Sequence, residues 1–197
     1  MKAIKIVKIL MVLVFTASTV FAQNKVIEVP SIPDNIEAFL SLRDSLATTP
    51  EGGAAIMITA LQMHARNKAL GMQAITIAMD SGNLMGGSVY KGYAPSSAIM
   101  YHIKRMESLP YVPFAYVQGA NPANGYSVSA PLRYNFSRNK YSGDEASGEV
   151  KVFVATYGVS ARPVRMKRND KGIWKAFELS SLFVGVQAPP SGKTDDL

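Results

Sequence analysis

The residue pattern changes near residue 110, from the spacing of helices to the alternation of β-strands. Before this point, apolar residues recur three or four positions apart, as in Ile99, Ile103 and Met106. After it, apolar residues alternate with small or polar ones, as in 149–156. An amphipathic helix buries about every third or fourth residue, whereas a strand with one buried face buries every second residue. The change therefore predicts an α+β domain, with about four N-terminal helices packed on a C-terminal antiparallel sheet of about four to six strands.

Capping residues mark the expected helix starts. The signals are Asp34 with Glu37, Thr49-Pro50-Glu51, Asn67, and Pro95 or Ser96. Side-chain oxygens at such positions accept hydrogen bonds from the free N–H groups of a first turn. They predict helices over about 35–47, from about 50, over about 68–79 and from about 96 to 106. The second helix contains the almost wholly apolar run 54–63, so we place it in the middle of the domain.

The remaining segments are expected to be loops and strands. Residues 80–88 have the composition of a loop. The expected strands are 126–136, 149–156, 163–168 and 173–178. Pro131 indicates an edge position or a bulge in the first of them, because proline cannot donate a ladder hydrogen bond. Asn169 to Gly172 carry the residues of a hairpin turn between the last two.

The first 22 residues have the pattern of a secretory signal peptide. Lysines precede an apolar run from Ile9 to Phe15, which is too short to span a bilayer core about 30 Å thick. Cleavage is expected between Ala22 and Gln23. The alternative is a retained membrane anchor. We expect an exported, soluble protein, periplasmic or secreted, with one domain over 23–187, a flexible tail over 188–197 and no membrane span after signal removal.

Charge and cysteine content exclude several classes of site. Removing residues 1–22 leaves 18 Lys and Arg against 14 Asp and Glu, so the formal net charge falls from +7 to +4. That excess is too small to predict nucleic-acid binding, which needs a dense stripe of cations. The chain has no cysteine, which excludes disulfides and thiolate metal ligands.

Motifs for catalysis are missing from the sequence. His64 and His102 lie on different expected helices without a metal-ligand spacing such as H-E-x-x-H. No G-x-S-x-G elbow holds a serine nucleophile. Asp144 and Glu145 are a carboxylate pair in a Gly- and Ser-rich segment typical of a solvated loop, although paired carboxylates also serve glycoside hydrolysis. We predict no catalytic residue, no metal site and no cofactor.

Aromatic residues concentrate in the middle of the chain. The tyrosines that we consider as ligand-binding residues are Tyr111, Tyr116, Tyr126 and Tyr134. Tyrosine rings line sugar or peptide grooves, and they also pack in half-buried sheets with the hydroxyl toward water. Residues 119–125, rich in Asn, Gly and Pro, are expected to form a loop that frames such a groove.

A basic hairpin is the second candidate for ligand binding. Arg165, Lys167 and Trp174 belong to the densest cluster of cations, and a ring beside cations suits an anionic glycan or a lipid headgroup. On a strand, Arg165 and Lys167 would point away from Val164 and Met166, which equally describes a solvated face. Both interpretations stay open at this point.

Several segments carry a resemblance to a known family. Among them are Thr49-Pro50-Glu51-Gly52, Leu70-Gly71-Met72-Gln73, Asn121-Pro122-Ala123-Asn124-Gly125-Tyr126 and Lys171-Gly172-Ile173-Trp174-Lys175. Together they resemble a family of exported bacterial proteins known only as a domain of unknown function. The resemblance covers about residues 34–187. It implies an exported bacterial protein, and it implies no activity, substrate or catalytic residue.

The sequence leaves three hypotheses for function. The first is a non-catalytic module that binds an unidentified ligand or partner of the cell envelope or the extracellular space. The second is a hydrolase acting on envelope or extracellular material, which requires carboxylates or a serine in a pocket. The third is a structural protein that self-associates through an exposed sheet edge marked by Pro131.

Overall fold

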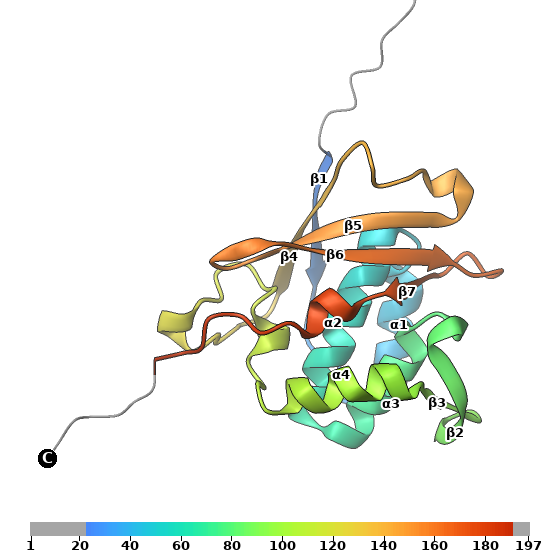
Figure 1. Cartoon of the computed structure of the whole chain (residues 1–197), viewed down its shortest axis with the longest axis horizontal. Helices are drawn as coiled ribbons and strands as arrows, with labels where there is room; N and C mark the ends of the chain where they lie inside the picture. The colour runs from blue at the N-terminus through green and yellow to red at the C-terminus, as the bar shows by residue number, and fades with distance from the viewer. Residues whose placement is uncertain (1–22, 191–197) are drawn as a thin grey trace, which may run out of the picture.

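A five-stranded antiparallel sheet carries its helices on one side (Figure 1). The computed structural model describes residues 23–190. The strand order is β1-β4-β5-β6-β7, and all neighbouring strands are antiparallel. The strands are β1 (Gln23–Val29), β4 (Leu132–Arg138), β5 (Glu149–Thr156), β6 (Val159–Arg168) and β7 (Trp174–Glu178).

Four helices and a small second sheet complete the described part of the chain. The helices are α1 (Ile36–Leu46), α2 (Pro50–Arg66), α3 (Lys68–Ala78) and α4 (Ser97–Glu107), and the small sheet pairs β2 (Leu84–Tyr90) with β3 (Tyr93–Pro95). The α+β class and the antiparallel sheet are confirmed. The expected order of elements was wrong, because β1 precedes the helices and β2 and β3 separate α3 from α4. Much of the segment 80–88 is therefore strand, where we had expected a loop.

Helix α2 forms the centre of the core. Its side chains are buried from Pro50 to His64, as its apolar run predicts. Gly53 and Gly71 permit close approaches of β7 and α3 to this helix. A Cβ on Gly53 would lie 2.5 Å from the carbonyl oxygen of Trp174, and a Cβ on Gly71 would lie 2.0 Å from the Cα of His64. The backbones of β7 and α3 thus pack directly against α2.

Side-chain caps begin α2 and α3 where the sequence indicates, the cap of α1 is shifted by one residue, and Ser96 precedes α4 without a side-chain cap hydrogen bond. Thr49 Oγ1 accepts from the N–H of Gly52 at 3.2 Å, and Asn67 Oδ1 accepts from the N–H of Leu70 at 3.1 Å. Helix α1 is capped by Asn35 instead of the predicted Asp34. Asn35 Oδ1 is the oxygen that reaches the N–H three residues on, at 2.8 Å, as an N-cap requires.

The strand that follows Pro131 lies inside the sheet. β4 begins at Leu132 and pairs with β1 on one side and β5 on the other, so Pro131 marks no edge strand and lies outside the strand itself. The edge strands are β1 and β7. The hairpin turn at 169–172 is present, with Asn169 Oδ1 accepting from the N–H groups of Lys171 and Ile173.

Residues 80–83 and the end of α1 cover the free edge of β7. The N–H of Asp80 donates to the carbonyl of Ala176 at 2.9 Å, and Asn83 Nδ2 donates to the carbonyl of Phe177 at 2.7 Å. The N–H of Trp174 donates to the carbonyl of Ala47 at 2.8 Å. These bonds satisfy backbone groups that an edge strand otherwise exposes.

Strands β4 and β5 separate along most of their length. Their register contains only the pairs Phe136 with Val154 and Ser137 with Phe153. Toward the start of β4, the chain segment 115–121 takes the place of β5, and the N–H of Gln118 donates to the carbonyl of Arg133 at 2.8 Å. The sheet therefore contains a split between β4 and the end of β5.

Two expectations concern residues outside 23–190. The signal peptide over 1–22 with its cleavage after Ala22, and most of the tail over 188–197, fall in segments that the structure does not describe. Gln23 is the first residue of β1. Within residues 23–190, no helix is long and apolar enough to cross a membrane.

Candidate functional site

Three adjoining hollows form a groove at the split in the sheet. The middle hollow, about 270 Å³, lies between segment 115–121 and the end of β5. It shares Val117, Gln118 and Gly119 with a hollow of about 340 Å³ that reaches Arg133. It shares Asn135 and Ala155 with a hollow of about 290 Å³ that reaches β1. We call these three hollows together the split groove.

Amide side chains dominate the polar lining of the split groove. They are Asn24, Gln118, Asn121, Asn124 and Asn135, with serine hydroxyls between them. Each amide presents both a donor and an acceptor. Asn121 and Asn124 use theirs on each other's backbone N–H and on the carbonyl of Gly119, so the amides left for a ligand are those of Asn24, Gln118 and Asn135. The groove therefore offers hydrogen bonds of both kinds along its length, as a partner with many hydroxyl groups requires.

The two cations of the split groove are neutralised by ion pairs. Lys25 Nζ lies 3.5 Å from Glu51 Oε2, and Arg133 Nε donates to Glu28 Oε2 at 2.9 Å. Of the described residues that line the groove, none is acidic and none is a histidine. The groove consequently presents little net charge to a ligand.

Buried polar atoms near the middle hollow are left without partners. Thr156 Oγ1 and Arg162 Nε are the two buried side-chain atoms, within residues 23–190, for which no hydrogen-bond partner is present. Thr156 lines the middle hollow. An unpaired buried hydroxyl costs about 1–3 kcal/mol, so this part of the groove carries a polar group whose hydrogen bonding is unsatisfied.

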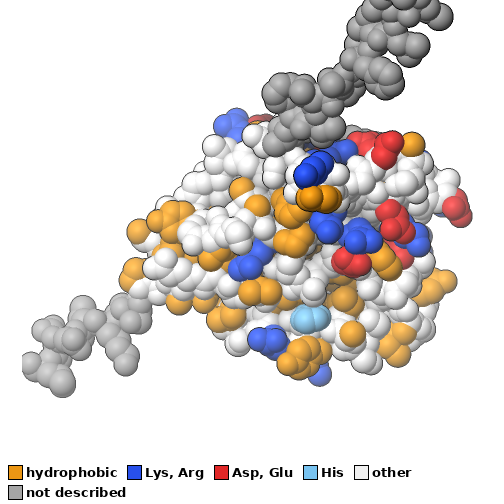
Figure 2. All heavy atoms as spheres, turned by 45° about the horizontal axis from the view of Figure 1, so that its top comes forward, with side chains coloured by type: hydrophobic (Ala, Val, Ile, Leu, Met, Phe, Trp, Pro, Cys, Tyr) orange, Lys and Arg blue, Asp and Glu red, His pale blue; other side chains and the backbone are white. Residues whose placement is uncertain are grey.

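An exposed aromatic ring stands at one end of the middle hollow. Tyr157 is 51% exposed and lines the hollow, at the turn between β5 and β6. Val159 beside it is also exposed. Figure 2 shows the molecule turned toward this side of the sheet. Charged side chains gather toward the right of the view, and the left part is mainly hydrophobic or uncharged.

The predicted tyrosines lie mostly in the core. Tyr116 is buried, lines the middle hollow, and donates its hydroxyl to the carbonyl of Leu182 at 2.9 Å. Tyr134 donates to Gln62 Oε1 at 2.9 Å. Tyr126 is buried, donates to the carbonyl of Gln187 at 2.7 Å, and stacks on Tyr111 with ring centroids 5.4 Å apart. These hydroxyls are thus bonded within the chain.

The basic hairpin lies outside the split groove. Arg165 Nε is 3.3 Å from Glu178 Oε2, and Lys167 Nζ lies 5.4 Å from the ring centroid of Phe177. Trp174 is buried against α2. The structure does not bring these residues together with the predicted tyrosines.

Sequence reasoning missed Gln118, Asn135 and Tyr157 as lining residues. One signal for the groove was present, because the loop expected to frame it, 119–125, contributes Gly119, Asn121 and Asn124. The other walls come from strands far apart in the chain. Their meeting depends on the split between β4 and β5.

A protein-family model matches residues 31–190 of this chain. The chain belongs to the family described as Domain of unknown function (DUF6935). The match includes every helix and the strands β2 to β7. No curated protein and no solved structure matches the chain. Membership in DUF6935 thus assigns no activity, and the function must be argued from the site.

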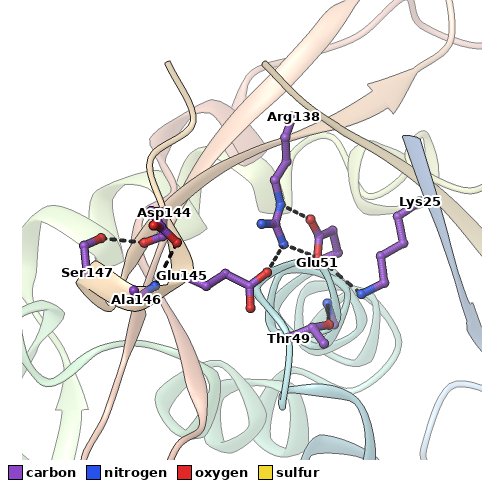
Figure 3. A network of polar contacts seen from close by, with 9 residues as sticks. Lys25, Thr49, Glu51, Arg138, Asp144, Glu145, Ala146 and Ser147 are labelled. Atoms are coloured by element: carbon purple, nitrogen blue, oxygen red, sulfur yellow. Dashed lines mark hydrogen bonds and ion pairs between the residues drawn. The ribbon is translucent and has the colours of Figure 1, made fainter. Parts of the chain in front are cut away.

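This DUF6935 member has a charged cluster at the start of α2 (Figure 3). The Arg138 guanidinium donates to both carboxylate oxygens of Glu51, and its Nη2 also donates to Glu145 Oε1 at 2.7 Å. Lys25 points toward Glu51 from β1. Burial acts to raise the pKa of Glu51, but the Arg138 hydrogen bonds and the nearby positive charges outweigh it and lower that pKa. The cluster holds β1 and β4 to α2.

His64 belongs to a second polar cluster. Its Nδ1 lies 3.1 Å from the carbonyl oxygen of Lys68, and its Nε2 lies 3.0 Å from Glu107 Oε1. A hydrogen bond from Lys68 Nζ, 2.8 Å from Glu107 Oε2, lowers the pKa of Glu107. His102 stacks on Phe183. In the part of the chain that the structure describes, no group of three or more acidic or histidine side chains is placed to hold a metal ion.

Proposed function

We propose that this chain is an exported binding module of the cell envelope or extracellular space, whose split groove holds a neutral, hydroxyl-rich chain such as a glycan. The pattern of residues 1–22 supports export. The continuity of three hollows supports an extended ligand, because each shares lining residues with the next.

The amide lining is the observation that carries this proposal. Sugar hydroxyls donate and accept at once, and so do the side chains of Asn and Gln. Lys25 and Arg133 each lie beside a glutamate, so the cations of the groove do not give it an excess of positive charge that would favour an anionic ligand. The Tyr157 ring supplies an apolar face beside these polar groups, as ligand sites commonly do.

The same lining favours binding over hydrolysis. Glycosidases use two carboxyl groups flanking the scissile bond. Among the described residues that line the split groove there is no Asp or Glu. Glu51 and Glu145, which lie near one another, are both bonded to Arg138.

Titration with oligosaccharides tests the proposal. The probes are the hexamers of cellulose, chitin, xylan and starch, with an oligogalacturonate as the charged comparison. Binding to the mature chain is measured by calorimetry and by changes in backbone amide NMR signals. We expect at least one neutral hexamer to bind and to shift the signals of Gln118, Asn135 and Tyr157, while the charged oligomer binds more weakly.

Variants then locate the binding site. Tyr157→Ala is expected to weaken binding about tenfold, the equivalent of about 1.4 kcal/mol. Asn135→Ala is expected to weaken it about fivefold through a lost hydrogen bond. Tyr141→Ala is the matched control, because Tyr141 is also an exposed tyrosine and lies outside the split groove. Absence of binding by every neutral hexamer, or equal losses in all three variants, contradicts the proposal.

A further inference from the structure

A second cavity lies on the helical side of the molecule, between α1, α3 and the β2–β3 sheet. Its volume is about 300 Å³. Its lining includes Arg43, Ile77, Asp80, Tyr93 and Lys175. It shares no lining residue with the split groove, so it is a separate site.

The amine of Lys175 is held in this cavity by one backbone acceptor. Its Nζ donates a hydrogen bond to the carbonyl oxygen of Ile77, near the C-terminal end of α3. Burial lowers the pKa of Lys175 to about 8, and the charge of Arg43 acts in the same direction. The carboxylates of Asp44 and Asp80 act against this shift. A neutral amine keeps its bond to Ile77 and still has a free lone pair.

Arg43 supplies a cation beside this amine. Its Nε and Nη2 donate to Asp44 Oδ1 at 2.8 Å and 2.6 Å. Neither contact uses Nη1, so the guanidinium retains donors for a ligand carboxylate. The Asp80 carboxylate lines the same cavity, and its Oδ1 accepts from the N–H of Gly82 at 3.0 Å.

We propose that this cavity binds a small 2-oxo acid, with the ligand carboxylate on Arg43 and the ligand carbonyl carbon joined to Lys175 as an imine. A 2-oxo acid places a carboxylate next to a carbonyl, which suits a guanidinium next to an amine. Ile77, Met79 and Leu84 provide an apolar wall for a short alkyl group. A desolvated lysine beside a second cation is an arrangement that activates amines toward carbonyl carbons.

The reaction needs no further reagent. The Nζ lone pair forms a bond to the carbonyl carbon, Nζ loses one proton, and the carbonyl oxygen takes up one proton to give a carbinolamine. The oxygen then takes up a second proton and leaves as water when the C–O bond breaks, and Nζ loses its remaining proton as the C=N bond forms. Nothing is oxidised or reduced. Asp80 is the acidic side chain in the cavity lining, and we assign these proton transfers to it.

Reductive trapping tests the proposal on the unmutated chain. The mature protein is incubated with pyruvate and cyanoborohydride at pH 8, and the reduced adduct is located by peptide mass mapping. We expect one predominant adduct, on Lys175. Its formation is expected to be about fivefold slower at pH 7, because the neutral fraction of an amine with a pKa near 8 falls by that factor. Adducts spread evenly over surface lysines overturn the proposal.

Variants separate the roles of the two cations. Lys175→Arg is expected to abolish the predominant adduct, whereas Lys171→Arg, on the exposed hairpin turn, leaves it unchanged. Arg43→Met removes a charge that lowers the pKa of Lys175, so it is expected to slow labelling by acetone, a ketone without a carboxylate, and to slow labelling by pyruvate at least tenfold more. Equal slowing with both ketones contradicts the role of Arg43. Thermal unfolding of each variant shows that it is folded.

Discussion

The backbone N–H of Gln118 donates to the carbonyl oxygen of Arg133 at 2.8 Å, on the side of β4 away from β1. In a regular sheet, this carbonyl would accept from the next strand. Here β5 has separated from β4, and a loop supplies the donor instead. The loop thus satisfies the carbonyl of Arg133 in place of β5, and the split groove lies between this loop and the end of β5.

Removal of that N–H is expected to destabilise the fold and the groove together. Gln118→Pro has no donor, so the carbonyl of Arg133 loses this hydrogen bond and the free energy of unfolding falls by about 1 kcal/mol. Gln118→Ala keeps the N–H, and the exposed side chain contributes little to stability, so we expect a change within about 0.5 kcal/mol. Urea unfolding measures both. Equal stability of the two variants would contradict a role for this bond.

The Glu51–Arg138 pair is expected to make the protein sensitive to acid. Because the pKa of Glu51 is lowered in the folded state, its contribution is present above the unfolded pKa of 4.5 and is lost as pH falls through the folded pKa. Glu51→Gln breaks a buried pair, and we expect a loss of about 3–5 kcal/mol at pH 7. Unfolding from pH 7 to pH 2 tests this. Glu145→Gln, on the half-exposed partner, should cost below about 1 kcal/mol.

Lys175 is expected to make stability rise with pH in mildly alkaline solution. Its folded pKa of about 8 lies below the unfolded value of 10.5, so the unfolded chain binds more protons between these limits and unfolding becomes harder as pH increases. Lys175→Met should remove this rise; the gain at pH 7 from removing a poorly solvated charge is reduced by the loss of the hydrogen bond to the Ile77 carbonyl. Lys171→Met is the control and should keep the rise. Above pH 10 the buried tyrosines act oppositely, because burial raises the pKa of Tyr134 to about 12.

Any side chain at Gly71 is expected to destabilise the protein, because α2 and α3 are in close contact there. A Cβ there would meet the backbone of His64 at 2.0 Å, so Gly71→Ala should force the helices apart and cost at least about 1–3 kcal/mol. Gly86→Ala is the matched control, since a Cβ at Gly86 meets nothing within 4 Å. Comparison of the two thermal midpoints measures the effect. A Gly71→Ala variant as stable as Gly86→Ala would show that the helices accommodate the methyl group.

Export is expected to yield a mature chain that begins at Gln23. When the whole chain is produced in a bacterial host, N-terminal sequencing of the periplasmic or medium fraction should start with Gln23-Asn24-Lys25. Retention of an uncleaved chain in the membrane fraction would instead identify residues 1–22 as an anchor.

Helix caps in this chain could be predicted from the sequence, but the pairing of distant strands could not. Thr49 and Asn67 cap helices as predicted, because the donor and acceptor lie three residues apart. The position of β4 was mistaken, because pairing with β1 joins segments about a hundred residues apart and nothing near Pro131 records it. The split groove was not predicted, because its walls also come from segments far apart in the sequence. The tyrosine pattern indicated an aromatic region, but burial of the rings was decided by partners such as Gln62 and Leu182.

The covered edge of β7 limits how copies of this protein can join. Within residues 23–190, β7 is blocked by Asp80, Asn83 and Ala47, and β1 is the remaining edge of the large sheet. Over the described residues, the large sheet can therefore be extended by one further strand, at β1. Two copies that pair through β1 use both open edges at once, so growth by this route terminates at a dimer and cannot produce a fibre.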